Sequence, residues 1–179
     1  MRRGIRHWQR NDEAVTAIEF AMLAMPLFML IFGILELGMF YASGSVLEGG
    51  ATQAARLIRT GQVQQSSDPK TLFEQQLCAN VSAMLDCTKL QYEVIHVSGD
   101  SFGSASSNAP VVDSNGNLVP QPFAPGTSDS VVLIRAYYKW TFYTPFIGSL
   151  LTGSTSKNWV AHMSTVVVKS EPYCSSACP

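Results

Sequence analysis

Two carboxylates flank an apolar stretch of the sequence, where a charged group needs a partner. Glu19 and Glu36 stand on either side of residues 20–35, which contain no charged residue. A carboxylate within or beside a membrane-spanning segment is costly and is usually paired. We expect Glu36 either to be wetted by lipid headgroups at the outer interface or to contact a neighbouring subunit or partner protein. We expect Glu19 either to lie at the inner interface, favoured by the helix dipole, or to pair with an amine.

The position of Glu19 also indicates a processing site. A cut after Ala14 would make Val15 the new N-terminus and Glu19 the fifth residue of the mature chain, followed by Phe20. The new α-amino group would be cationic at neutral pH and could pair with the Glu19 carboxylate in apolar surroundings. Type IV prepilins are cut just before a hydrophobic helix whose fifth residue is Glu. Ala14 stands where prepilins usually have Gly.

All four cysteines, Cys78, Cys87, Cys174 and Cys178, follow the apolar stretch, as an oxidising compartment would favour. Their spacings do not match the Cys-x2-Cys pattern of structural zinc, so we predict disulfides and no metal. Nine residues of continuous helix separate two Cα atoms by about 13 Å, whereas a disulfide needs about 7 Å or less. A Cys78–Cys87 bridge therefore requires a helix end near Asp86. The connectivity of the four cysteines stays open.

The apolar stretch predicts a membrane-spanning helix. Residues 15–40 would extend about 39 Å as a helix, which exceeds the roughly 30 Å hydrocarbon core and allows some tilt. This length favours a retained anchor over a signal peptide; a late cut at residues 42–44 is the alternative. The four arginines of the first ten residues precede the span, and Arg56 is the first cation after it. The positive-inside rule therefore places the N-terminus in the cytoplasm.

Small and helix-bending residues within the span predict contacts with other helices. Small residues recur on one face and would let another helix approach closely, although this is also ordinary transmembrane composition. A proline removes one helical hydrogen bond and bends the helix. The residues predicted to serve helix packing or assembly are Ala17, Ala21, Pro26, Gly33, Glu36 and Gly38.

The remaining sequence predicts an α+β domain outside the membrane. We divide the chain into a basic cytoplasmic leader (1–14), the span and its helical continuation (15–61), and an extracytoplasmic domain (62–179) with a polar loop at about 99–130. An apolar stripe at residues 46–58, a helix starting at Ser67 or Asp68, and strands near residues 92–97, 131–143 and 160–168 predict a small antiparallel sheet against one or two helices. A short apolar loop is expected to join the last two strands.

No pattern of catalytic residues stands out. His96 and His162 fall in predicted strands and are expected to be ordinary sheet residues. Motifs of nucleophilic hydrolases, zinc proteases and phosphate-binding loops do not occur in the sequence. The net charge of −1 does not favour nucleic-acid binding. We therefore expect neither an enzyme nor a cofactor-binding protein.

The N-terminal half resembles the TadE-like family, minor pseudopilins of the tight-adherence (Flp-type) pilus machinery. The resemblance rests on Ala17, the Glu19-Phe20 pair, Pro26, the string at residues 33–38 and the Ala-rich segment at residues 51–56. The last two predicted strands, joined by an aromatic-Pro turn, extend it to residues 130–170.

This resemblance implies a pilin-like structural or assembly component in the bacterial inner membrane, with a periplasmic domain. Its expected partners are other pilus or pseudopilus subunits, inner-membrane assembly proteins, the lipid bilayer and, if the chain is cut, a prepilin peptidase. Whether the protein enters a surface pilus stays open. The alternative is a membrane-anchored periplasmic binding module unrelated to pili, with the loop at 99–130 as its recognition element.

Overall fold

The computed structural model describes residues 12–154 and 157–173. Within them the elements follow the order α2, α3, η1, β1, α4, β2, α5 and β3. The arginines of the predicted basic leader lie outside the described residues, as do Cys174 and Cys178. The roles proposed for these residues therefore stay predictions.

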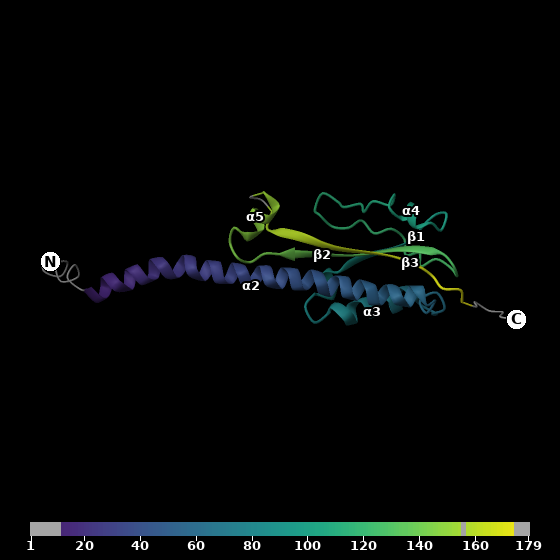
Figure 1. The fold of residues 1–179 in the computed structure, drawn as a ribbon, viewed down its shortest axis with the longest axis horizontal. Coiled ribbons are helices and arrows are strands. Elements are labelled where there is room, and N and C mark those ends of the chain that lie inside the picture. Colours follow the sequence, from purple (N-terminus) through teal and green to yellow (C-terminus); the bar gives the residue numbers. More distant parts are fainter. Residues whose placement is uncertain (1–11, 155–156, 174–179) are drawn as a thin grey trace.

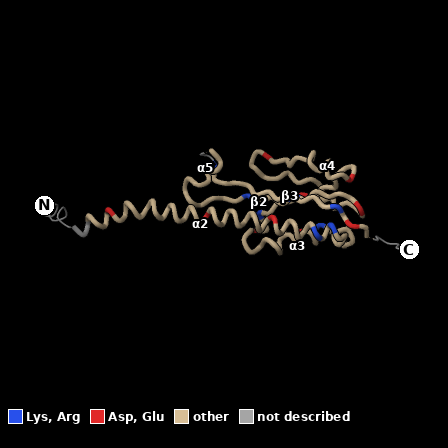
Figure 2. Tube along the Cα trace, viewed as in Figure 1, with Lys and Arg blue, Asp and Glu red and all other residues tan. Residues whose placement is uncertain are grey.

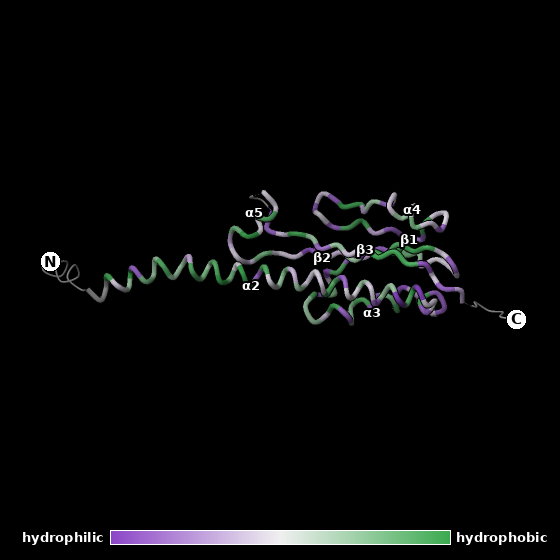
Figure 3. Tube along the Cα trace, in the orientation of Figure 1, coloured by the Kyte–Doolittle hydropathy of each residue, from purple (hydrophilic) through white to green (hydrophobic). Residues whose placement is uncertain are grey.

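The first element, α2 (Asp12–Arg59), is one continuous helix of 48 residues. Among the described residues, it is the one helix that is long and apolar enough to cross a membrane. Its first half is mostly apolar (Figure 3) and carries few charges (Figure 2). It changes direction within that half (Figure 1), which contains Pro26. Gly49 and Gly50 do not interrupt it.

The second helix, α3 (Pro69–Val81), packs beside the second half of α2 (Figure 1). Its start is as predicted, because the Asp68 side chain accepts a hydrogen bond of 3.2 Å from the Thr71 N–H and Pro69 occupies the first turn. The helix ends at Val81. A turn at residues 82–85 follows it, and Leu85 still reaches the core from that turn.

Three strands form one antiparallel sheet in the order β1-β2-β3. They are β1 (Gln91–His96), β2 (Val131–Thr141) and β3 (Trp159–Lys169). The central strand pairs Val94 with Ile134 on one side, and Ile134 with Val166 on the other. The predicted α+β architecture is therefore confirmed. The connection from β2 to β3 differs from the predicted loop, because it contains a short helix, α5 (Ile147–Thr152).

The sheet is covered on both faces. One face packs on α2 and α3, with Leu47, Ile58, Phe73 and Ile134 in the main core. The polar segment that follows β1 covers the other face (Figure 1) and contains the short helix α4 (Phe102–Ala105). Alternate residues of β2 point to the two faces, which explains why eight consecutive residues from Val131 are buried.

Side-chain contacts hold the polar loop onto the sheet. The Tyr137 hydroxyl donates a 2.6 Å hydrogen bond to the Gly116 carbonyl, and the Gln91 side chain accepts one of 2.6 Å from the Leu118 N–H. A bridge between Val112 and Leu118 closes a tight turn that contains Gly116, whose φ of 75° favours glycine. The loop is thus a packed layer of the domain.

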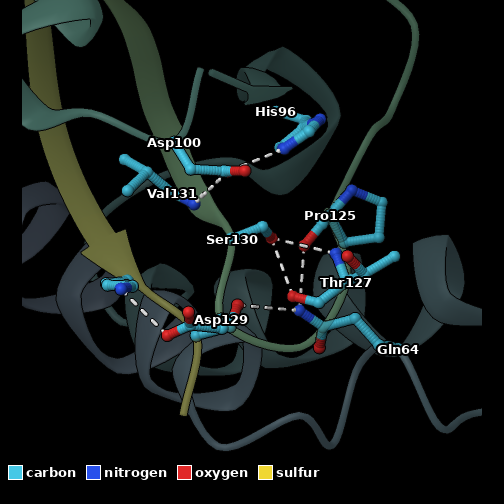
Figure 4. A network of polar contacts seen from close by, with 10 residues as sticks. Gln64, His96, Asp100, Pro125, Thr127, Asp129, Ser130 and Val131 are labelled. Carbon is cyan, nitrogen blue, oxygen red and sulfur yellow. Dashed lines mark hydrogen bonds and ion pairs between the residues drawn. The ribbon is translucent and has the colours of Figure 1, made fainter. Parts of the chain in front are cut away.

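A polar network joins the start of β2 to its surroundings (Figure 4). The Asp100 carboxylate accepts hydrogen bonds of 2.9 Å from the Val131 N–H and from the His96 ring. The first of these contacts, followed by that to His96, lowers the pKa of Asp100. Gln64 donates a 2.8 Å hydrogen bond to the Pro125 carbonyl. His96 is therefore a structural residue at a loop end.

A disulfide joins Cys78 in α3 to Cys87, the first residue of the 3-10 helix η1 (Cys87–Lys89). Their Cα atoms lie 5.6 Å apart, which is possible because α3 ends at Val81. The requirement that the helix end before Cys87 is therefore met.

Replacing Cys78 and Cys87 together by serine should lower the free energy of unfolding by about 2–3 kcal/mol, because the unfolded chain regains the entropy of an open loop. Urea unfolding of the full chain in detergent micelles measures this. Reduction of the unsubstituted protein should have a similar effect. A double variant as stable as the unsubstituted protein would contradict the expectation.

Candidate assembly interface on the N-terminal helix

The second half of α2 contributes one long buried stripe to the domain. Spacings of three and four residues, which keep side chains on one helix face, run through the stripe. Its buried members are Gly33, Glu36, Phe40, Ser43, Leu47, Gly50, Ala51, Ala54, Ala55 and Ile58. The sequence predicted this stripe from residue 46 onwards, and the structure extends it by four turns toward the N-terminus.

The first half of α2 extends beyond the domain (Figure 1). Residues 15–32 are exposed except Ala24, which is half-buried, and as a helix they span about 27 Å. Most are large and apolar, including Phe20, Leu23 and Phe28. A water-exposed surface of this kind marks a membrane or protein contact. Glu19 is exposed in this segment, beside the apolar residues Ile18 and Phe20.

Glu36 binds the polypeptide backbone of its own chain. Its carboxylate accepts a hydrogen bond from the Tyr143 N–H and one of 2.9 Å from the Thr144 N–H, at the turn that follows β2. The side chain is buried, with 8% exposed. The partner of Glu36 is therefore its own chain, and not the lipid headgroup or the neighbouring subunit that we expected from the sequence. The sequence missed this pairing because the two segments are more than a hundred residues apart.

An aromatic cluster joins α2 to β3 one helical turn after Glu36. The rings of Phe40 and His162 have centroids 4.2 Å apart, and Phe142 lies 5.2 Å from Phe40 by the same measure. The Ser43 hydroxyl lies 3.1 Å from His162 Nε2 and donates to the Phe40 carbonyl. Burial lowers the pKa of His162, partly offset by the Phe40 carbonyl. His162 is therefore a packing residue of the α2–β3 contact.

Close helix packing at Gly50 fixes α3 against α2. A Cβ atom at this position would lie 2.4 Å from Val81 Cγ1, whereas one at Gly49 would meet nothing within 4 Å. Gly50 is thus required by the α2–α3 contact, and Gly49 is not.

The two glycines form a matched pair of test positions. Gly50→Ala should lower the free energy of unfolding by about 1–2 kcal/mol through overpacking against a stiff, branched neighbour. Gly49→Ala should raise it by about 0.5–1 kcal/mol, because alanine favours the helix. Thermal unfolding of both variants in micelles checks the opposite signs. Equal shifts would show that α3 does not pack at Gly50 as described.

The structure separates the predicted packing residues into two groups. Gly33 and Glu36 are buried against the chain's own domain, whereas Ala17, Ala21, Pro26 and Gly38 are exposed. The exposed group is free to meet other helices, and its role stays a prediction. The backbone of Ala14 lies in α2 and its side chain is outside the described residues, so the cut before Val15 is likewise untested. Among the described residues, no group of three or more candidate metal ligands comes together.

One apolar N-terminal helix, carrying an α+β domain on its second half, fits the class of single-pass membrane-anchored proteins. Residues 14–56 match the model of the family described as TadE-like protein. The match begins at the predicted processing site and ends within the domain half of α2, so the resemblance predicted for the N-terminal segment is confirmed. It does not include residues 130–170. No match was found among curated proteins or among solved structures.

Proposed function

We propose that this protein is a pilin-like structural or assembly component of a tight-adherence pilus system. In this proposal α2 anchors it in the bacterial inner membrane, with the N-terminus in the cytoplasm and the domain in the periplasm. The observation that carries the proposal is the exposed apolar half of α2, which continues without a break into the helix that builds the domain core. The family match at residues 14–56 supports the same system.

The exposed half of α2 needs an apolar environment, and two environments suit it. Lipid covers it while the protein is in the membrane, since residues 15–32 are nearly as long as the hydrocarbon core is thick. Helices of other subunits can cover the same surface in an assembly, and Ala17 and Ala21 would allow their close approach. The helix keeps its own backbone hydrogen bonds in both environments, so it can change surroundings without refolding.

Glu19 supplies the specific element of such an assembly. It is exposed on residues 15–32, which we call the free half of α2, and lies beside the apolar residues Ile18 and Phe20. A carboxylate there is stabilised most by a cation brought by a partner. In a processed subunit, the α-amino group of Val15 is such a cation, and neighbouring subunits could pair amine and carboxylate.

The first test is the N-terminal residue of the protein from its native membrane, measured by intact mass and peptide mapping. Processing predicts a start at Val15. The second test is Glu19→Ala, which should leave the protein in the membrane but sharply reduce surface pili counted by electron microscopy. Glu48→Ala is the matched control, because Glu48 is an exposed glutamate on the domain half of the same helix. Normal piliation of Glu19→Ala, with Met1 retained, would sink the proposal.

The alternative, a periplasmic binding module, relied on the loop at 99–130 as a recognition element. The Tyr137 hydroxyl donates a hydrogen bond to this loop and the Gln91 side chain accepts one from it, which holds the loop on the sheet. A loop already packed in this way gives the alternative less support than a free one would.

A further inference from the structure

The connection between β2 and β3 contains an exposed apolar segment, residues 143–151, which we call the tip. Four large side chains of the tip are exposed: Tyr143 (88%), Phe146 (77%), Leu150 (80%) and Leu151 (44%). The sequence contains no charged residue between Lys139 and Lys157. A contiguous uncharged apolar surface of this kind marks an interaction site.

The tip contacts α2 at the C-terminal end of its charge-free run, near Gly33 and Glu36. Glu36 binds the N–H groups of Tyr143 and Thr144, and Gly33 approaches Ile147 so closely that a Cβ would lie 3.2 Å from its Cδ1. Figure 1 shows α5 at the end of the domain from which the free half of α2 emerges. The tip therefore cannot change its depth independently of α2.

The length of the helix places this level at a membrane boundary. A hydrocarbon core of about 30 Å corresponds to about 20 helical residues, since each residue rises 1.5 Å. A span that begins at Val15 therefore reaches the outer boundary near Gly33 and Glu36. This is the level at which the tip contacts α2.

We propose that the tip inserts into the outer face of the same bilayer that α2 spans, as a second point of membrane contact. This inference rests on the proposed function in one respect: α2 must be in a membrane, with the domain outside. The tip would fix the tilt and rotation of the domain on the membrane. The occupant of this surface is lipid, because the hydrogen bonds from Tyr143 and Thr144 to Glu36 place the tip beside the apolar half of α2.

The local chemistry of the tip suits the membrane interface. Trp and Tyr side chains favour this depth, and Tyr143 is the most exposed large side chain of the tip. The tip also satisfies polar groups internally, as a lipid environment requires. The Leu150 N–H and the Ser149 hydroxyl each donate a 2.9 Å hydrogen bond to the Phe146 carbonyl, and the Thr152 hydroxyl donates one of 2.8 Å to Gly148.

The backbone of Phe146 indicates that its exposure is maintained at a cost. Its φ of 70° lies in the left-handed region, which bulky side chains rarely adopt. A glycine or asparagine would relieve the strain at this position. A strained backbone that presents an aromatic ring to the outside is consistent with a functional contact.

Photo-crosslinking of the full chain in phosphatidylcholine–phosphatidylglycerol vesicles tests the proposal. The residue p-benzoylphenylalanine replaces Phe146 in one variant and Leu150 in a second, which guards against a folding defect at the strained position. Phe28, exposed on the free half of α2, is the positive control for lipid contact. Phe102, an exposed phenylalanine of α4 far from the span (Figure 1), is the matched negative control. Mass spectrometry identifies the adducts.

The expected result is roughly tenfold more lipid adduct at Phe146 and Leu150 than at Phe102, since acyl chains reach only the first two. Adducts at Phe28 with none at either tip position would overturn the inference and leave the membrane anchor intact. No lipid adduct at Phe28 would overturn the anchor as well. Adducts of the tip to a second copy of the chain, in place of lipid, would also overturn the inference.

Discussion

Replacing Arg135 by methionine should lower the free energy of unfolding by about 3–5 kcal/mol, the loss typical when one partner of a buried ion pair is removed. The Arg135 guanidinium donates hydrogen bonds to the Glu93 carboxylate across the β1–β2 pair and to the Asn108 carbonyl of the polar loop. Its side chain is 5% exposed and that of Glu93 is 2% exposed. The substitution therefore leaves a buried carboxylate without its cation and removes one of the contacts that hold the loop on the sheet.

Two further variants separate the buried pair from a general effect of losing arginine. Arg59→Met breaks the 3.1 Å pair with Glu171, whose side chains are more than half exposed, and should cost about 0–1 kcal/mol. Combining Arg135→Met with Glu93→Leu removes both charges and should recover much of the loss. Urea unfolding in micelles compares the three. If Arg135→Met is no more harmful than Arg59→Met, the pair does not anchor the loop.

The elements with strong local signals were predictable from sequence. Asp68 and Pro69 mark the start of α3 by a capping side chain and a fixed φ, and both act within a few residues. Helix rise alone gave the condition for a Cys78–Cys87 disulfide, a helix end between the two cysteines, although the pairing itself stayed open in the sequence. The strands showed as β-branched and aromatic runs bounded by turn residues.

The contacts of α2 between residues 33 and 43 were missed in the sequence, because three of the four buried residues there are not apolar. Gly33, Glu36 and Ser43 occupy buried positions of the stripe. A search for hydrophobic periodicity passes over them. The spacing itself was the available signal, since steps of three and four residues continue from Leu47 back through Ser43 and Phe40.

Long-range partners explain the other differences. The buried pair of Glu93 and Arg135 is hidden in strands whose other residues are apolar, and only the register of β1 on β2 brings the two together. The sequence did not indicate that the loop at 99–130 packs on the sheet, because its Ser, Gly, Pro and Asn content is typical of a mobile segment. Its Asn108 and Gly116 carbonyls are instead satisfied by side chains of the central strand.

The position of Glu36 has a mechanical consequence for the anchor. The free half of α2 and the domain meet at this residue, and the hydrogen bonds to Tyr143 and Thr144 join them there. Without these bonds the domain would still pack on α2 from Phe40 onward. The turn after β2 would then be free to move away from the helix.

Glu36→Ala should therefore release this turn locally while the domain stays folded. Losing two hydrogen bonds to a charged acceptor is worth about 3 kcal/mol, which corresponds to roughly a hundredfold faster amide exchange if the turn opens by itself. Hydrogen–deuterium exchange of a peptide covering residues 141–150, in the full chain in vesicles, measures this. Glu48→Ala is the matched control, because Glu48 is exposed on the same helix and should leave the peptide unchanged. Unaltered exchange in Glu36→Ala would mean that Gly33 and Phe40 alone hold the turn, and that the carboxylate is not what joins the span to the domain.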